Sequence, residues 1–337
     1  MSLESPKRIT EAFARWNEPV LAEIARVLPP GHEGSGSVAD MAWYHLATGG
    51  KRLRPLFALL ATEALGGDPR TALPFAAGCE LLHNATLVHD DYQDGDTMRR
   101  SQPTVWRHYG WEQSINCGDA LYFAGLRLVA ETAVPHETAR ELVRTTSKRL
   151  LEVIEGQTEE FNLKRRFHQG NNLREAEYVR VIRGKTAALF ALPLEGAALI
   201  AGHGVAAAAT LGQAGETLGL LFQVQDDLLD LIGEKGRHIV GSDLAEGKPS
   251  LPVVFGLEMA TERDQRHLEA IVKSPREHTS TAEITEAISI LERSGAMARA
   301  FDAVTAWRKE LVSGTPALDS LLAELVDAIL LPIAHRL

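Results

Sequence analysis

Two short acidic runs contain the residue types and the spacing that metal binding requires. Both read Asp-Asp-x-x-Asp: Asp90, Asp91 and Asp94 in the first run, and Asp226, Asp227 and Asp230 in the second. Each run ends an apolar stretch of helical character, and helical residues four apart lie one turn apart on the same side. Carboxylates packed this closely repel one another unless a cation neutralises them. Oxygen-only ligands suit magnesium, which commonly bridges protein carboxylates to substrate phosphates.

Other polar side chains share these helical faces. The same spacing places His83 and Thr86 on the face of Asp90, and Gln223 on the face of Asp226. For either run alone, an acidic helical face that points at water is an equally good interpretation. The pattern occurs twice, however, each time after an apolar stretch, and this repetition favours a metal-diphosphate site that lines a cavity.

Basic residues that could hold a diphosphate precede and follow the first run. Lys51 and Arg54 come after a Gly-Gly pair, just before a helix whose N-terminus would attract anions, although a solvated helix cap is the alternative. Arg99 and Arg100 follow the run, and guanidinium groups chelate phosphate oxygens as a fork. The candidates around the second run are weaker: the isolated pair Lys185 and Thr186, and Arg237, Asp243 and Lys248 in a Gly-rich loop.

The composition predicts a large helical protein. The chain has 337 residues, is 45% hydrophobic and only 6% aromatic, and consists largely of Ala-, Leu-, Glu- and Arg-rich stretches. Its formal net charge of −10 argues against a nucleic-acid or anionic-membrane binder. Cys79 and Cys117 are expected to be free thiols in a reducing cytoplasm, and the first residues do not form a signal peptide. The apolar stretch 187–211 is interpreted as core rather than as a transmembrane segment, because Pro193, Glu195 and His203 interrupt it.

These residues must be positioned by helices, since no strand-like alternation of useful length is found. The expected helices are 6–27, 38–48, 72–92, from Gly118 to about 131, 137–168, 205–232, 252–272, 281–296, 298–313 and 316–335. No linker or repeat divides the chain. We therefore expect one all-α domain over residues 1–337, a single large helical bundle with its site in a central cavity between helices.

Several motifs together resemble the trans-type polyprenyl diphosphate synthases, over about residues 45–255. They are GGKRLRP at 49–55, HDDYQDGDTMRRSQPT at 89–104, GQ at 156–157, KT at 185–186, FQVQDDLLD at 222–230 and GSDLAEGKPSLP at 241–252. The sequence departs from the family pattern at Ser101 and Ser250, and the loop around Arg237 is one residue longer than usual.

The resemblance implies a fold of the isoprenoid synthase type and a set of site residues. The six aspartates would bind magnesium, which manganese can replace, with Asp230 the weaker participant; Asp90, Asp91, Asp94, Lys185, Asp226 and Asp227 are the expected catalytic residues. Isopentenyl diphosphate would be held by Lys51, Arg54, His83 and Arg100. The allylic diphosphate would be held by Arg99, Lys185, Thr186, Gln223 and Lys248. The resemblance also implies a homodimer.

The reaction implied is the head-to-tail condensation of isopentenyl diphosphate with an allylic prenyl diphosphate. Metal ions and fixed cations stabilise the diphosphate as its C–O bond breaks, and an apolar tunnel keeps the allylic cation from water. Ala85 and Thr86 stand five and four positions before Asp90, where large aromatic side chains would close the tunnel. Their small size predicts a product of twenty carbons or more, and the resemblance implies that this product is all-trans.

Three other functions are compatible with parts of the sequence. A class I terpene cyclase also ionises allylic diphosphates, but it would leave the GGKRLRP motif unexplained. A non-catalytic subunit of a heteromeric synthase would not need both aspartate runs. A helical scaffold without a ligand would leave the clustered charges without a role.

Overall fold

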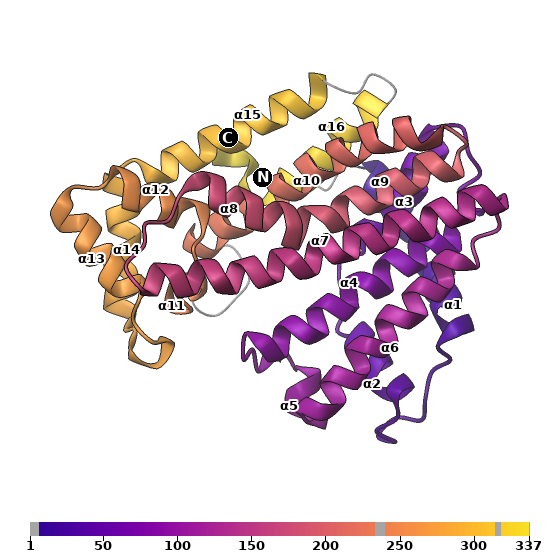
Figure 1. Cartoon of the computed structure of the whole chain (residues 1–337), viewed down its shortest axis with the longest axis horizontal. Coiled ribbons are helices and arrows are strands. Elements are labelled where there is room, and N and C mark those ends of the chain that lie inside the picture. Colours follow the sequence, from indigo (N-terminus) through magenta and orange to yellow (C-terminus); the bar gives the residue numbers. More distant parts are fainter. Residues whose placement is uncertain (1–6, 233–239, 314–317, 337) are drawn as a thin grey trace. The chain divides into compact units, whose positions relative to one another are not determined.

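The computed structural model describes residues 7–232, 240–313 and 318–336, and these residues form an all-helical protein (Figure 1). The expected fold class is therefore confirmed. Residue contacts divide the chain into two compact units. Each unit is named after the acidic run that it contains. The first-run unit comprises Lys7–Lys148 and Ala191–Gly212. The second-run unit comprises the described parts of Arg149–Phe190 and Gln213–Leu337. The expectation of a single domain stays a prediction. Arg237 lies outside the described residues.

The first-run unit is built around α4. Its elements are α1 (Lys7–Val27), α2 (Val38–Ala47), α3 (Leu53–Ala64), α4 (Leu73–Gln93), β1 (Met98–Arg99), β2 (Gln102–Pro103), α5 (Val105–Tyr109) and α6 (Trp111–Ala130), with parts of α7 (His136–His168), α9 (Ala188–Ile200) and α10 (Gly204–Ile232). Helix α4 packs against α6, α3 and α1, and α4 and α6 run side by side (Figure 1).

Small residues bring α4 and α6 into close contact. A Cβ added at Gly118 would lie 2.2 Å from Nε2 of His89, and one at Gly78 would lie 2.9 Å from the carbonyl oxygen of Gly125. The prediction that Gly118 opens a helix is therefore wrong. Helix α6 begins seven residues earlier, at Trp111 after Gly110 (φ 98°), and Gly118 lies within it because His89 occupies the space of a side chain.

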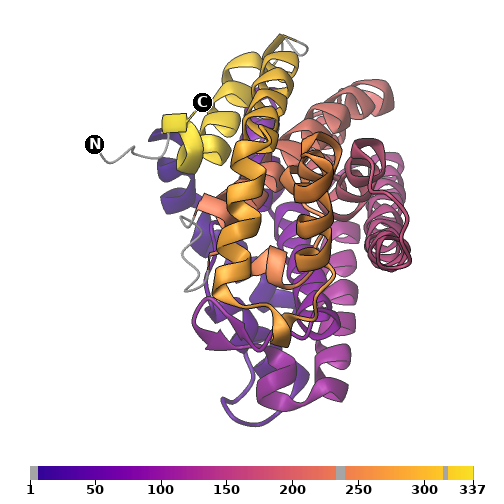
Figure 2. The ribbon, with the colours of Figure 1, turned by 90° about the vertical axis from the view of Figure 1, so that its left-hand side faces the viewer.

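The second-run unit combines α10 with the C-terminal helices. Its remaining elements are α8 (Glu175–Ile182), the π-helical turn η1 (Arg183–Ala187), α11 (Ser242–Ala245), α12 (Leu251–Met259), α13 (Glu262–Val272), η2 (Arg276–His278), α14 (Thr281–Arg293), α15 (Ala296–Ser313), α16 (Asp319–Leu330) and η4 (Leu331–Arg336). Helix α15 packs against α12, α14 and α16, which appear from orange to yellow in Figure 2.

The observed secondary structure differs from the expected one at two places. The single helix expected over 252–272 is two helices, because the Thr261 side chain accepts a hydrogen bond from the Asp264 backbone N–H and caps a new start. A two-residue hairpin, β1 with β2, was also missed, since pairs this short carry no periodic pattern.

One helix among the described residues is long and apolar enough to cross a membrane. It is α10, which has 29 residues, and half of its most apolar window is already buried within the protein. Half-burial of this kind is common to core helices, and α10 also carries the second acidic run. Cys79 and Cys117 are both free and buried, as expected; the cytoplasmic location inferred from them stays a prediction.

Candidate active site

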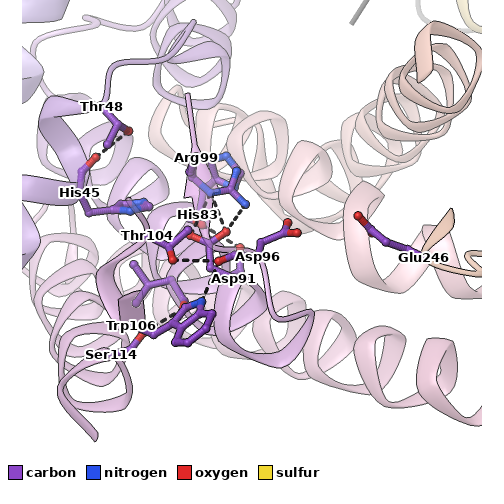
Figure 3. Close-up of polar contacts among 12 residues, drawn as sticks. His45, Thr48, His83, Asp91, Asp96, Arg99, Thr104, Trp106, Ser114 and Glu246 are labelled. Atoms are coloured by element: carbon purple, nitrogen blue, oxygen red, sulfur yellow. Dashed lines mark hydrogen bonds and ion pairs between the residues drawn. The ribbon is translucent and has the colours of Figure 1, made fainter. Parts of the chain in front are cut away.

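The first acidic run ends α4, and its middle aspartate is turned into the protein. Asp91 is 1% exposed in its side chain, and the Arg99 guanidinium donates to both of its oxygens, at 2.6–3.0 Å (Figure 3). Burial raises the pKa of the Asp91 carboxyl, while the hydrogen bonds from Arg99 lower it. Asp90 and Asp94 are only partly buried. The run therefore divides into one anchored carboxylate and two that a cation could reach.

A short hairpin positions the arginine pair. The backbone N–H of Asp96 donates to the Asp91 carbonyl (2.8 Å), and Thr104 and Trp106 both donate to the Asp96 carbonyl (2.8 and 2.7 Å), as Figure 3 shows. At the tip, Arg100 and Ser101 have φ values of 49° and 65°, as a type I′ turn demands at both central positions. Ser101 thus has a backbone conformation that favours glycine. Glycine is the usual residue at this position in the family that the sequence resembles.

Basic groups collect beside this run within the same unit. A Cβ added at Gly50 would lie 2.8 Å from Nη1 of Arg100, so the Gly-Gly turn lets that guanidinium approach the backbone. Arg54 is buried, and this burial lowers its pKa to about 10. Burial, followed by the charges of Arg54, Arg99 and Arg100, holds the pKa of His83 well below its ordinary value. The positive charges of Arg54, Arg99 and Arg100 around this histidine suit a polyanionic ligand.

Arg52, the middle cation of the Gly-Gly-Lys-Arg-Leu-Arg stretch, has a structural role. Arg52 has a left-handed backbone (φ 44°) at the start of α3 and donates to the Glu80 carboxylate (2.8 Å) and the Asn17 side chain (3.0 Å). Both members of the Arg52–Glu80 ion pair are buried. Lys51, by contrast, is exposed. Sequence reasoning missed Glu80, because a lone glutamate in an apolar helix gives no indication of its distant partner.

In the second run, the middle aspartate is again anchored. Oδ2 of Asp227 accepts hydrogen bonds from the Tyr178 hydroxyl (2.6 Å) and the Leu251 backbone N–H (3.0 Å), and Oδ1 accepts one from Gln223 (3.0 Å). Burial raises the pKa of Asp227 to about 7, against the effect of these hydrogen bonds. Asp226 is partly exposed.

The last aspartate of this run is buried as well. Oδ1 of Asp230 accepts from the Ser242 hydroxyl (2.6 Å), and Oδ2 accepts from the backbone N–H of Asp243 (2.9 Å). Sequence analysis assigned no role to Tyr178, which is distant from the run in sequence. It assigned none to Ser242 either, although this serine lies within the motif quoted at 241–252.

The basic residues expected to hold the allylic diphosphate already contact acidic groups. Lys185 pairs with Glu160 on α7, and Lys248 lies 2.6 Å from Glu246 and 3.8 Å from Asp243. The Thr186 hydroxyl donates to Oε1 of Gln223 (2.7 Å), which connects the Lys-Thr pair to the second run.

The Gly-Gln pair of α7 has a packing role in this arrangement. A Cβ added at Gly156 would lie 2.1 Å from the backbone nitrogen of Lys185, and one at Gly184 would lie 2.8 Å from the carbonyl oxygen of Glu152. The two backbones therefore cross in contact, and this crossing fixes the η1 turn that carries Lys185 and Thr186.

The two chain-length candidates differ in their surroundings. Ala85 is fully buried and shares the face of α4 that contains Gly78 and His89, which contact α6. Thr86 lies nearer the Asp90 side, and its hydroxyl donates to the His83 carbonyl (2.7 Å). The effect of these residues on product length stays a prediction.

The donor set can be tested for its fit to magnesium. Among the described residues, no three His, Cys, Asp or Glu side chains converge to enclose a metal ion. Magnesium seldom needs such a cage, because it retains waters and binds one or two carboxylates together with substrate phosphates. The partly exposed carboxylates of Asp90, Asp94 and Asp226 fit this mode of binding.

A helical protein with two aspartate runs at helix ends, each next to basic groups, has the features of a prenyltransferase. The family model described as polyprenyl synthetase matches residues 36–291, and the chain belongs to this family. The resemblance inferred from the motifs is thereby confirmed, and the chain is a prenyltransferase enzyme.

Individual relatives agree. A short chain isoprenyl diphosphate synthase of Methanothermobacter thermautotrophicus is 38% identical over 256 residues, which cover 75% of this chain and 76% of the relative. A geranylgeranyl pyrophosphate synthetase structure from Pyrococcus horikoshii has a TM-score of 0.84 and 30% identity, covering 95% of this chain and 98% of that one. A Caulobacter crescentus polyprenyl synthase, complexed with calcium and isoprenyl diphosphate, has a TM-score of 0.84 and 28% identity, covering 96% and 97%.

Proposed function

We propose that the enzyme condenses isopentenyl diphosphate with an allylic prenyl diphosphate and releases an all-trans prenyl diphosphate of twenty carbons or more. The observation that carries this proposal is the cluster of Arg54, His83, Arg99 and Arg100 beside the first acidic run. It supplies donors and positive potential for a diphosphate next to carboxylates that can bind a metal ion. The Caulobacter relative, solved with a divalent cation and isoprenyl diphosphate, supports the same ligand class.

In the proposed mechanism, Asp90 and Asp94 of the first-run unit, and Asp226 of the second-run unit, would hold magnesium, or manganese in its place. Magnesium bound by these carboxylates would neutralise the charge of the leaving diphosphate. Arg99, Lys185 and Lys248 hold the leaving diphosphate by charge-assisted hydrogen bonds. The second substrate is held by Lys51, Arg54, His83 and Arg100. The double bond of isopentenyl diphosphate attacks the allylic carbon, and loss of a proton regenerates an allylic diphosphate five carbons longer.

Product length is proposed from the small residues below the first run. Ala85 and Thr86 leave room where aromatic side chains would end the tunnel, and the Pyrococcus relative is named for a twenty-carbon product. The decisive experiment incubates purified enzyme with labelled isopentenyl diphosphate, an allylic primer and Mg²⁺, and identifies the products by chromatography. Products of twenty carbons or more are expected. Mostly fifteen-carbon product would refute the open tunnel, and turnover without isopentenyl diphosphate would indicate a cyclase instead.

We also propose that the enzyme is a homodimer. Along α6, Trp111, Ile115 and Phe123 are exposed at steps of four or eight residues, so they form one apolar stripe on the helix. On α7, Leu151, Ile154 and Phe161 form a second exposed stripe. Ordered apolar stripes of this kind commonly mark protein interfaces.

A further inference from the structure

We propose that Tyr178 is a positioning residue that holds Asp227 and, through it, fixes the segment Gly241–Leu251, which carries Lys248. The inference rests on the proposed function only in its expected effect on activity. Tyr178 lies on α8 and is 4% exposed, and its hydroxyl donates to Oδ2 of Asp227 at 2.6 Å. A buried phenol needs a partner for its O–H, and here that partner is the middle carboxylate of the second run.

Asp227 and Asp230 together attach α10 to the segment Gly241–Leu251. Asp227 accepts from the Leu251 N–H at the start of α12, and Asp230 accepts from Ser242 and from the Asp243 N–H at the start of α11. The segment is therefore attached at both ends. Lys248 lies between the two attachment points. Its position therefore depends on Asp227 and Asp230, which hold the segment on either side of it.

Asp226 lies on an adjacent, partly exposed face of α10, because successive residues on a helix project about 100° apart and Asp227 is buried. Oδ2 of Asp227 accepts hydrogen bonds from both Tyr178 and Leu251, so loss of the Tyr178 hydroxyl would let this carboxylate turn and would loosen its bond to the start of α12. The segment that carries Lys248 would then be held less firmly.

The three donors to Asp227 are all uncharged. They are the Tyr178 hydroxyl, the Leu251 backbone N–H and the Gln223 amide. Donors of this kind orient a carboxylate without adding a positive charge beside it. Arg99 holds Asp91 in the first run by a cation instead. Tyr178 therefore anchors its aspartate without supplying a charge that would compete with a divalent ion.

The test compares Tyr178→Phe with the wild-type enzyme by two measurements. The first is Mn²⁺ binding in the presence of inorganic diphosphate, followed by electron paramagnetic resonance, which needs no turnover. The second is the Mg²⁺ concentration that gives half-maximal condensation. We expect the Mn²⁺ dissociation constant and the half-maximal Mg²⁺ concentration each to rise about tenfold, as for other residues that orient metal ligands. The KM for isopentenyl diphosphate should change less than about twofold, because its proposed ligands lie in the other unit.

Ser280→Ala is the matched control for lost stability. It removes the capping box of α14 and contacts neither run, so it should lower the melting temperature while leaving both metal constants unchanged. If Tyr178→Phe does not fold, Ser242→Ala removes one donor to Asp230 and should shift the constants in the same direction.

The outcomes separate the inference from the proposed function. Unchanged Mn²⁺ binding in Tyr178→Phe, with metal binding abolished in Asp226→Ala, would overturn the positioning role. If Tyr178→Phe lowers Mn²⁺ affinity tenfold in the wild-type enzyme but has no further effect in the Asp227→Asn variant, the positioning role is supported. The hydroxyl would then act only through that carboxylate. If the wild-type enzyme made no condensation product while Tyr178→Phe still weakened Mn²⁺ binding, the proposed function would fail and the positioning role would stand.

Discussion

The Arg99 guanidinium contacts both oxygens of Asp91: Nε lies 2.8 and 3.0 Å from them, and Nη2 lies 2.6 Å from Oδ1. This bidentate pair is buried on the aspartate side, whereas the neighbouring Asp90 is partly exposed. Two adjacent aspartates in the same motif therefore have different surroundings. Asp91 holds the β1–β2 hairpin through Arg99, and Asp90 is the one proposed to bind a metal ion.

This difference predicts distinct effects for two matched substitutions. Asp90→Asn should lower kcat by about three orders of magnitude, or about 4 kcal/mol, because a metal ligand is lost, with little change in stability. Asp91→Asn should also destabilise the fold, by about 3 kcal/mol, because Arg99 loses its ionised partner. Steady-state kinetics and urea unfolding separate the two. Asp302→Asn, at an exposed position on α15, is the control; equal loss of stability in all three variants would contradict the assignment.

Acid should destabilise the protein through His45. Burial, and then the charges of Arg99 and Arg100, lower its pKa from 6.5 to about 3 in the folded state. Between these values the unfolded chain binds a proton that the folded protein does not. The stability that depends on His45 is thus complete above pH 6.5 and is lost as the pH falls toward 3, by up to about 1.4 kcal/mol per pH unit.

The His45→Gln variant should show a shallower loss of unfolding free energy in urea titrations run between these two pH values. His278→Gln, at an exposed position, should retain the wild-type slope. An unchanged slope in His45→Gln would show that another group dominates the acid response.

The Arg52–Glu80 pair should be costly to break. Their side chains are only 9% and 7% exposed, and Glu80 also accepts from Asn84 (3.0 Å). Glu80→Gln leaves the Arg52 charge buried without its counter-ion and should reduce the unfolding free energy by about 3–5 kcal/mol. The exposed pair of Arg140 and Glu137 offers the comparison: Glu137→Gln should cost less than about 1 kcal/mol. Similar losses at both sites would argue against a special role for burial.

The proposed dimer should depend on the apolar stripe of α6. Phe123 is 73% exposed in the isolated chain, so Phe123→Glu should leave the fold intact and place charges in the interface. Light scattering at several protein concentrations should then report a monomer. Val205→Glu changes an exposed apolar residue outside the stripe and should stay dimeric. If the wild-type enzyme were monomeric at all concentrations tested, the proposed homodimer would be refuted.

Helices with strong apolar periodicity could be predicted from sequence. The expected spans 6–27, 137–168 and 205–232 differ from α1, α7 and α10 by one residue at one end. Gly118 was misread because local sequence does not distinguish a glycine that opens a helix from one that admits a neighbouring side chain. The approach of His89 is a tertiary contact, and only the structure reveals it.

The candidate site was predictable in its residue types but not in its division of roles. Spacing alone groups Asp226 with Asp227, since both belong to one motif. The direction of the Asp227 carboxylate depends on donors far along the chain, such as Tyr178, whose hydroxyl is unremarkable in an amphipathic helix. Helical periodicity places a side chain on a face, whereas the packing of other elements decides whether that face is enclosed.

Lys185 and Lys248 contact internal carboxylates, those of Glu160 and Glu246. A diphosphate that binds these lysines must therefore exchange with an anion that the chain itself provides. The displaced glutamates remain tethered close by at high effective concentration, and they can reclaim the lysines once the chemistry is complete. The internal competitors that weaken substrate capture would thus speed the departure of inorganic diphosphate, so turnover need not stall on a tightly held by-product.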